Sequence, residues 1–87
     1  MAEVVLPRSL VALFPGASRR IRASGSTVAE VIADLDANLP GIRNRIVDAG
    51  PVIRTHINIF VEGDRASLST PVPDNATVHV IPAVSGG

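Results

Sequence analysis

The stretch Ser26–Leu39, STVAEVIADLDANL, decides the fold of this 87-residue chain because it predicts one well-capped amphipathic helix. Thr27 and Glu30 have the spacing of a capping box, in which each side chain satisfies the backbone N–H of the other residue. Apolar side chains recur every three or four positions and form one stripe: Val28, Val31, Ile32, Leu35 and Leu39. Pro40-Gly41 ends the helix. A helix with one such stripe has to pack it against another apolar surface.

The segments on both sides of this helix alternate between apolar and polar residues, which is typical of half-buried strands. We predict strands and one short helical turn at the following places: Glu3–Pro7, Arg19–Ser24, Ile57–Glu62, Arg65–Leu68 and Thr77–Pro82, with the turn at Ile42–Val47. The first two strands are expected to form a hairpin across a short loop at Pro15-Gly16. The sequence therefore predicts an α+β fold. Its mixed sheet has four to five strands, with one main helix packed across one face and the first and last strands side by side in the centre.

The composition favours a single globular domain and excludes several classes of protein. The chain has 46% hydrophobic and 18% charged residues, and its eight acidic residues balance eight basic ones, all arginine. With two Phe, no Trp and no Tyr, it lacks both the positive charge and the aromatic platforms of a nucleic-acid binder. No apolar run approaches the ~20 residues of a membrane span, and no signal peptide is recognisable. We therefore expect a cytoplasmic protein without nucleic-acid or membrane partners.

The sequence contains no motif for catalysis or metal binding. It has no cysteine, which excludes disulfides, thiolate ligands and cysteine nucleophiles. His56 and His79 have no third ligand at a recognisable spacing, so no metal site is expected. No Ser/His/Asp set, glycine-rich phosphate loop or pair of catalytic carboxylates is present. We therefore predict no catalytic residue of the chain's own and no bound cofactor, and expect any chemistry at the C-terminal end.

The sequence closes on a glycine pair, preceded by Ala83, Val84 and Ser85. Because Pro82 cannot donate to a sheet ladder, we expect residues 1–82 to form the domain and residues 83–87 a flexible tail. Glycine has no Cβ, so Gly86 and Gly87 can thread a narrow channel and bring a terminal carboxylate into another protein's active site. The alternative is an unstructured terminus without a function, as most chain ends are.

Two apolar side chains are expected on the outer face of the sheet. Phe60 and Ile81 lie opposite the inward residues of their strands, and an exposed apolar patch often marks a partner site. The alternative is that Leu10 or Phe14 covers this patch. Three arginines within residues 19–22 are explained either as a docking point for an acidic partner or as the solvated face of a strand.

The whole chain resembles the ubiquitin-like sulfur carriers of the ThiS/MoaD type, and CysO-like carriers most closely. The resemblance is carried by residues 27–35, by the His-x-Asn-Ile-Phe-Val stretch from His56 to Val61, and by the Pro-Ala-Val-Ser-Gly-Gly ending. Where this family commonly has Asp-Gly-Asp before its last strand, this chain has Asp74-Asn75-Ala76. Asn tolerates a left-handed turn, so the turn is expected to survive. The resemblance implies a β-grasp, ubiquitin-like fold.

The resemblance also implies a carrier function. An E1-like partner would use ATP to adenylate the Gly87 carboxylate, and sulfur from a persulfide or sulfide would displace AMP and leave a thiocarboxylate. A biosynthetic enzyme would then accept the sulfur, for cysteine in CysO-like carriers, or for molybdopterin or thiamine. A MoaD-like chain would act as the small subunit of a synthase.

Two other functions remain open from the sequence. The first is a ubiquitin-like modifier whose Gly87 is conjugated to target lysines, since its chemistry begins with the same adenylate. The second is a binding subunit that docks by its sheet and never reacts.

Overall fold

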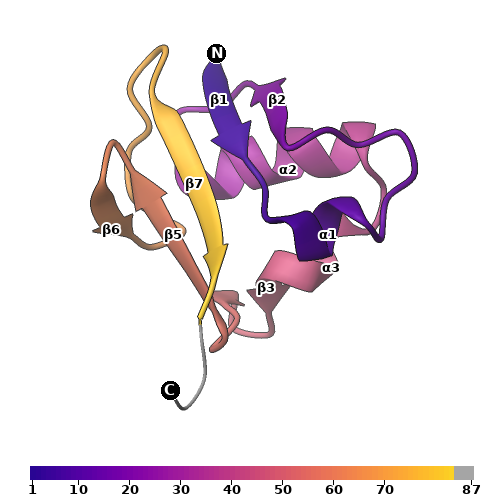
Figure 1. The fold of residues 1–87 in the computed structure, drawn as a ribbon. Helices are drawn as coiled ribbons and strands as arrows, with labels where there is room; N and C mark the ends of the chain where they lie inside the picture. The colour runs from indigo at the N-terminus through magenta and orange to yellow at the C-terminus, as the bar shows by residue number, and fades with distance from the viewer. Residues whose placement is uncertain (84–87) are drawn as a thin grey trace.

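The computed structural model describes residues 1–83, and within them the chain forms a sheet with three helices against it (Figure 1). The elements are, in order, β1 (Ala2–Val5), α1 (Arg8–Val11), β2 (Arg20–Ala23), α2 (Val28–Asn38), α3 (Ile42–Ile46), β3 (Val47–Asp48), β4 (Val52–Ile53), β5 (Ile57–Val61), β6 (Asp64–Ala66) and β7 (Thr77–Pro82). Five strands form one sheet in the order β2-β1-β7-β5-β6, and β3 pairs only with β4.

The central strand of the sheet is β7, the last strand of the chain. It runs parallel to β1, with Val4 opposite Val78, and antiparallel to β5, with Ile59 opposite Val80. The outer pairs β1–β2 and β5–β6 are antiparallel. The predictions of a mixed sheet and of adjacent first and last strands are therefore confirmed.

Helix α2 crosses one face of this sheet and buries the predicted stripe (Figure 1). Its first N–H groups, which have no partner within a helix, are satisfied by other parts of the chain. The N–H groups of Val28 and Ala29 donate to the carbonyls of Thr70 and Leu68, at 3.0 and 2.9 Å. The segment after β6 thereby holds the start of α2.

The capping box is present in a modified form. Thr27 Oγ1 accepts the Glu30 N–H at 3.2 Å, as predicted. The Glu30 carboxylate, however, accepts the N–H of Ser26 at 2.8 Å instead of that of Thr27. Both side chains therefore fix the N-terminus of α2, with the return bond displaced by one residue.

One hydrophobic core lies between the helices and the sheet. The inward residues of the central strands are almost fully buried, among them Val4, Ile59 and Val78. Leu10 of α1 and Ile42 of α3 belong to the same cluster. The short helices are thus held by burial of one large side chain in α1 and of two, Ile42 and Ile46, in α3, since helices this short have little stability of their own.

The connection from β1 to β2 differs from the predicted short loop. β1 ends at Val5, and Pro7 is the N-cap of α1, with its carbonyl accepting the N–H groups of Leu10 and Val11. Its backbone is extended, with φ −72° and ψ 155°, and the missing proline N–H leaves no helical hydrogen bond unmade at this position. The hairpin pairing itself is confirmed, but its connection is a helix that buries Leu10.

Candidate functional site

The C-terminal tail leaves the sheet from its central strand. β7 ends at Pro82, opposite Ile57, the first residue of β5. Ala83 then donates its N–H to the carbonyl of His56 at 2.7 Å. Because β1 runs parallel to β7, the turn into α1 lies at the same edge of the sheet. The root of the tail, Pro82 and Ala83, therefore lies between the start of α1 and the turn before β5.

Of the predicted tail residues, only Ala83 lies within the described part of the chain. It is partly buried and still hydrogen-bonded to the body, so the bonded domain extends one residue past the predicted boundary at Pro82. Val84, Ser85, Gly86 and Gly87 lie outside the described residues, and their roles stay predictions.

The outer face of the sheet carries Phe60 and Ile81 as neighbours. Phe60 pairs with His79 and Ile81 pairs with Asn58, so the two apolar side chains are diagonal neighbours on one face. Ile81 is 43% exposed, and Phe60 is partly buried. The prediction that both side chains lie on this face is confirmed, and their binding of a partner stays a prediction.

The sequence analysis missed two further apolar residues beside Ile81. Val5 and Pro7 line a hollow of about 220 Å³ together with Ile81 and Pro82, at the root of the tail. The alternation of the strand indicates the position of Val5, because Val5 faces opposite to the buried Val4 and Leu6 and must lie on the outer face.

The expected covering of this face by Leu10 or Phe14 is wrong. Leu10 is 7% exposed and belongs to the core on the other side of the sheet. Phe14 lies beside Gly41, where its ring would be 3.6 Å from a Cβ at that position. Leu10 lies in α1 and Phe14 follows it, and α1 directs this part of the chain toward the other helices.

Two of the three arginines within residues 19–22 form contacts inside the domain. Arg20 forms an ion pair with Glu3 at 2.7 Å, across the β1–β2 pair. Arg19 donates from Nε to the Leu6 carbonyl at 3.3 Å. These contacts favour the interpretation of residues 19–22 as a solvated strand face. Within residues 1–83, no helix is both long and apolar enough to cross a membrane.

Comparison with known proteins finds one matching family model and relatives of similar length. The model of the ThiS family matches residues 7–87. The sulfur carrier protein CysO of Mycobacterium tuberculosis is 36% identical over 78 residues, which are 83% of this chain and 84% of that protein. The small archaeal modifier protein 3 of Haloferax volcanii is 30% identical over 66 residues, 71% of each chain.

Solved structures agree with the fold. CysO in the crystal structure of the Amycolatopsis orientalis BexX/CysO complex superposes with a TM-score of 0.88, at 28% identity and over 100% of both chains. The crystal structure of M. tuberculosis CysO gives a TM-score of 0.87 at 32% identity, over 97% of this chain and 100% of that one. The fold is therefore the ubiquitin-like β-grasp. With a family model that spans almost all of its length, the chain belongs to the ThiS family of ubiquitin-like sulfur carriers.

Proposed function

We propose that this protein carries sulfur as a thiocarboxylate on Gly87 and hands it to a biosynthetic enzyme. The proposal makes it a cosubstrate of other enzymes and not a catalyst. It is supported by the family, by the identity to CysO, and by the position of the tail root at the end of the central strand.

The observation that carries the proposal is the way in which the body holds the root of the tail. β7 is hydrogen-bonded on both sides, to β1 and to β5, and the bond from Ala83 to His56 adds one more contact after the last strand residue. Because the chain is bonded to the body up to Ala83, only the four residues after it set how far the end group can reach. A partner that grips the sheet can therefore align that group, and alignment lowers the barrier to reaction.

The chemistry needs only the terminal carboxyl group of this chain. An α-carboxyl with a pKa of about 3.5 is ionised at neutral pH and can attack the α-phosphate of ATP in the partner's site, releasing pyrophosphate. Hydrosulfide then attacks the acyl adenylate and expels AMP, which leaves the thiocarboxylate. A persulfide donor would form an acyl disulfide, from which a thiol releases the same product. Gly86 and Gly87 leave room for both steps because they carry no side chain.

We place the partner contact on the outer face of the sheet at Phe60, Ile81 and the adjoining Val5. These apolar side chains lie beside the tail root, so one partner can bind the patch and receive the tail together. CysO of A. orientalis is found in a complex with BexX, which supports complex formation as a property of such carriers. We propose an E1-like adenylating enzyme as the first partner and a sulfur-accepting enzyme as the second.

The similarity to CysO supports cysteine synthesis as the destination of the sulfur, with molybdopterin or thiamine synthesis as alternatives. Conjugation to protein lysines is the second candidate function. It is supported by the identity to the small archaeal modifier protein 3. The chain has no lysine, so copies of it cannot be linked to one another through side-chain amines.

The direct test is reconstitution with the adenylating enzyme, ATP and sulfide, followed by intact mass spectrometry. Wild-type protein should gain one sulfur in place of one oxygen. Gly87→Ala and the deletion of Gly87 should keep their unfolding temperature and yield no thiocarboxylate. A full yield from either variant would contradict the role of the glycine tail.

The same reaction in a lysate distinguishes the two functions. Products of higher mass that survive thiol treatment indicate conjugation to lysine. Thiocarboxylated protein of unconjugated size that loses its sulfur when an acceptor enzyme is present indicates sulfur transfer.

A further inference from the structure

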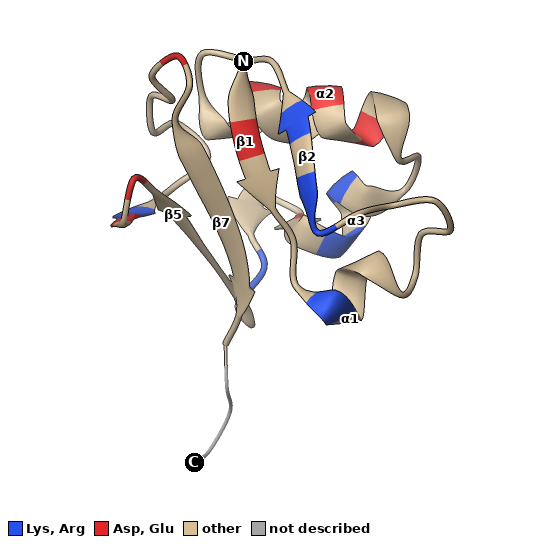
Figure 2. Cartoon of the chain, turned by 45° about the horizontal axis from the view of Figure 1, so that its top comes forward, with Lys and Arg blue, Asp and Glu red and all other residues tan. Residues whose placement is uncertain are grey.

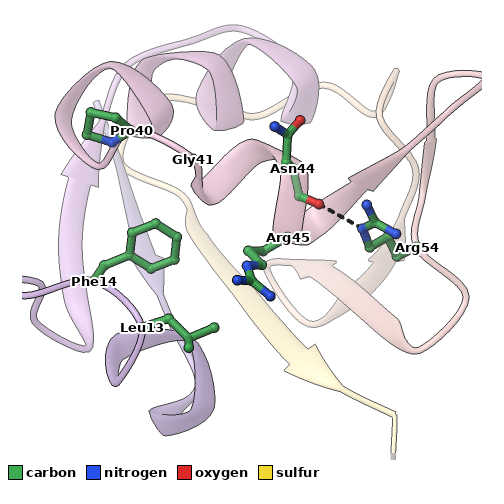
Figure 3. A pocket seen from close by; sticks show the side chains of 7 residues that line it. All are labelled: Leu13, Phe14, Pro40, Gly41, Asn44, Arg45 and Arg54. Atoms are coloured by element: carbon green, nitrogen blue, oxygen red, sulfur yellow. Dashed lines mark hydrogen bonds between the residues drawn. The ribbon is translucent and has the colours of Figure 1, made fainter.

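A large hollow in the described part of the molecule lies on the helix side, away from the sheet face. Its volume is about 760 Å³, and it lies between the chain after α1 and the helix α3 (Figure 3). Leu13, Phe14 and Pro40 supply apolar groups, and Asn44, Arg45 and Arg54 supply polar ones. No carboxylate lines it.

One wall of this hollow is cationic. Arg54 is held in place, because its Nε donates to the Asn44 carbonyl at 2.8 Å and its guanidinium lies 3.7 Å from Asp48 Oδ2 (Figure 3). Arg45 is exposed, and among residues 1–83 it forms neither an ion pair nor a side-chain hydrogen bond. The guanidinium of Arg45 is therefore available to a carboxylate from outside, which it can bind through two parallel hydrogen bonds.

The opposite wall is apolar and exposed. Leu13 is 50% exposed, one of the few large hydrophobic side chains at this level in residues 1–83. Phe14 is partly buried, and its ring points into the same space as Leu13 (Figure 3). An apolar side chain inserted here would cover both residues and remove their surface from water.

The charges around the hollow favour a negatively charged ligand. Arginines lie on α1 and α3 around this end of the molecule, where Asp48 pairs with Arg54, whereas most carboxylates lie on α2, on β1 and at the far loops (Figure 2). The nearby Asp36 is already engaged, since its Oδ1 accepts the N–H groups of Gly41 and Arg43. A neutral chain thus presents a positively charged end to an incoming partner.

We propose that this hollow binds a short acidic segment of a partner protein, in which a carboxylate lies next to an aromatic or large aliphatic side chain. The carboxylate pairs with Arg45, and the apolar side chain packs between Leu13 and Phe14. A nucleic-acid strand fits less well, because its phosphates would leave the apolar wall uncovered.

The hollow also has a defined relation to the tail. Arg54 lies two residues before His56, whose carbonyl holds Ala83, and Ile57 donates to the Arg54 carbonyl at 3.0 Å. The hollow and the tail root therefore both adjoin the turn before β5. The hollow lies on the helix side of the sheet, and the patch formed by Phe60 and Ile81 lies on the outer face. A segment bound in the hollow would leave the sheet face free for another protein.

Selection of random linear peptides displayed on phage against the full-length protein tests this proposal. Peptides with Asp or Glu within three positions of Phe, Trp, Leu or Ile should be enriched. On titration, they should shift the amide NMR signals of Leu13, Phe14 and Arg45. Arg45→Glu should weaken their binding about tenfold, and Leu13→Ser about fivefold.

Matched controls separate this site from general effects. Arg65→Glu reverses an exposed arginine on the sheet, and Val52→Ser removes an apolar side chain that is 54% exposed. Both controls should bind the peptides as wild type does, and so should Gly87→Ala, because binding requires no chemistry at the tail. All five variants should keep the wild-type unfolding temperature.

Three outcomes would overturn the proposal. The first is a selection without enrichment, or with enrichment of basic peptides. The second is peptide binding that survives both Arg45→Glu and Leu13→Ser. The third is binding of single-stranded oligothymidylate that depends on Arg45 and is unaffected by Leu13→Ser, which would assign the hollow to phosphate.

Discussion

Gly25, between β2 and α2, lies too close to the helix for any side chain. A Cβ at this position would be 2.6 Å from the Val31 nitrogen and 2.8 Å from the Glu30 Cβ. At Gly16, with φ +88°, a Cβ would meet nothing within 4 Å, so alanine there strains only the backbone. We expect Gly25→Ala to lower the free energy of unfolding by about 1–3 kcal/mol more than Gly16→Ala does, in urea denaturation. Equal losses in the two variants would refute the close packing of β2 on α2.

Asp74 gives a prediction of pH dependence at the same scale. The N-terminal ammonium of Met1 hydrogen-bonds to Asp74 Oδ1 at 2.6 Å and lowers the pKa of this carboxyl below its ordinary value of 3.8. A carboxyl with a lowered folded-state pKa stabilises the fold above its unfolded-state pKa, and this contribution is lost as the pH falls through the folded-state value. Wild type should therefore unfold at a slightly higher temperature than Asp74→Asn at neutral pH. The difference should vanish well below pH 3.8, and a difference that grows with acid would contradict the ion pair.

At the scale of elements, the start of α2 is the most testable feature. Thr27→Ala removes the acceptor of the Glu30 N–H and should lower the free energy of unfolding by about 1 kcal/mol. Thr27→Ser keeps the hydroxyl and should retain most of that stability. Chemical denaturation of the three proteins measures both differences, and a Thr27→Ser variant as unstable as Thr27→Ala would show that the cap is not the cause.

Element length explains which parts of the fold could be predicted from sequence. α2 is 11 residues long and β7 is six, so the periodicity of each is clear, and both were located correctly. α1 has only four residues, about one helical turn, which leaves no period to detect. β3 and β4 have two residues each and pair only with each other, so no alternation marks them, and neither strand was predicted.

Of the candidate sites, one could be located from a local sequence pattern and the other could not. Phe60 and Ile81 were placed on the outer face by strand parity, which is a local property of the sequence. The hollow at Leu13 and Arg45 joins segments that the sequence separates by about thirty residues and that only tertiary packing brings together. Asp36 of α2 caps the start of α3, because Gly41 turns the chain back onto it, and no local pattern in the sequence marks this contact.

At the scale of the whole molecule, the proposed function depends on the sheet face beside the tail root. We expect Ile81→Asp to weaken binding of the adenylating enzyme about tenfold, because it places a charge in an apolar contact. Ile81 is 43% exposed, so the unfolding temperature should change little. Val52→Asp, a similarly exposed residue outside this sheet, is the matched control. Calorimetric titration of the adenylating enzyme measures both affinities. If both variants bind it equally strongly, the sheet face is not part of the interface.

The central claim is that the body exists to present the Gly87 carbonyl carbon to other enzymes. Intact mass spectrometry of the protein purified from its native host, without added activator or sulfide, tests this most directly. We expect a fraction of molecules in which one sulfur replaces one oxygen, with fragmentation locating the change at Gly87. Protein that carries only the carboxylate, from cells whose sulfur metabolism is active, would contradict it.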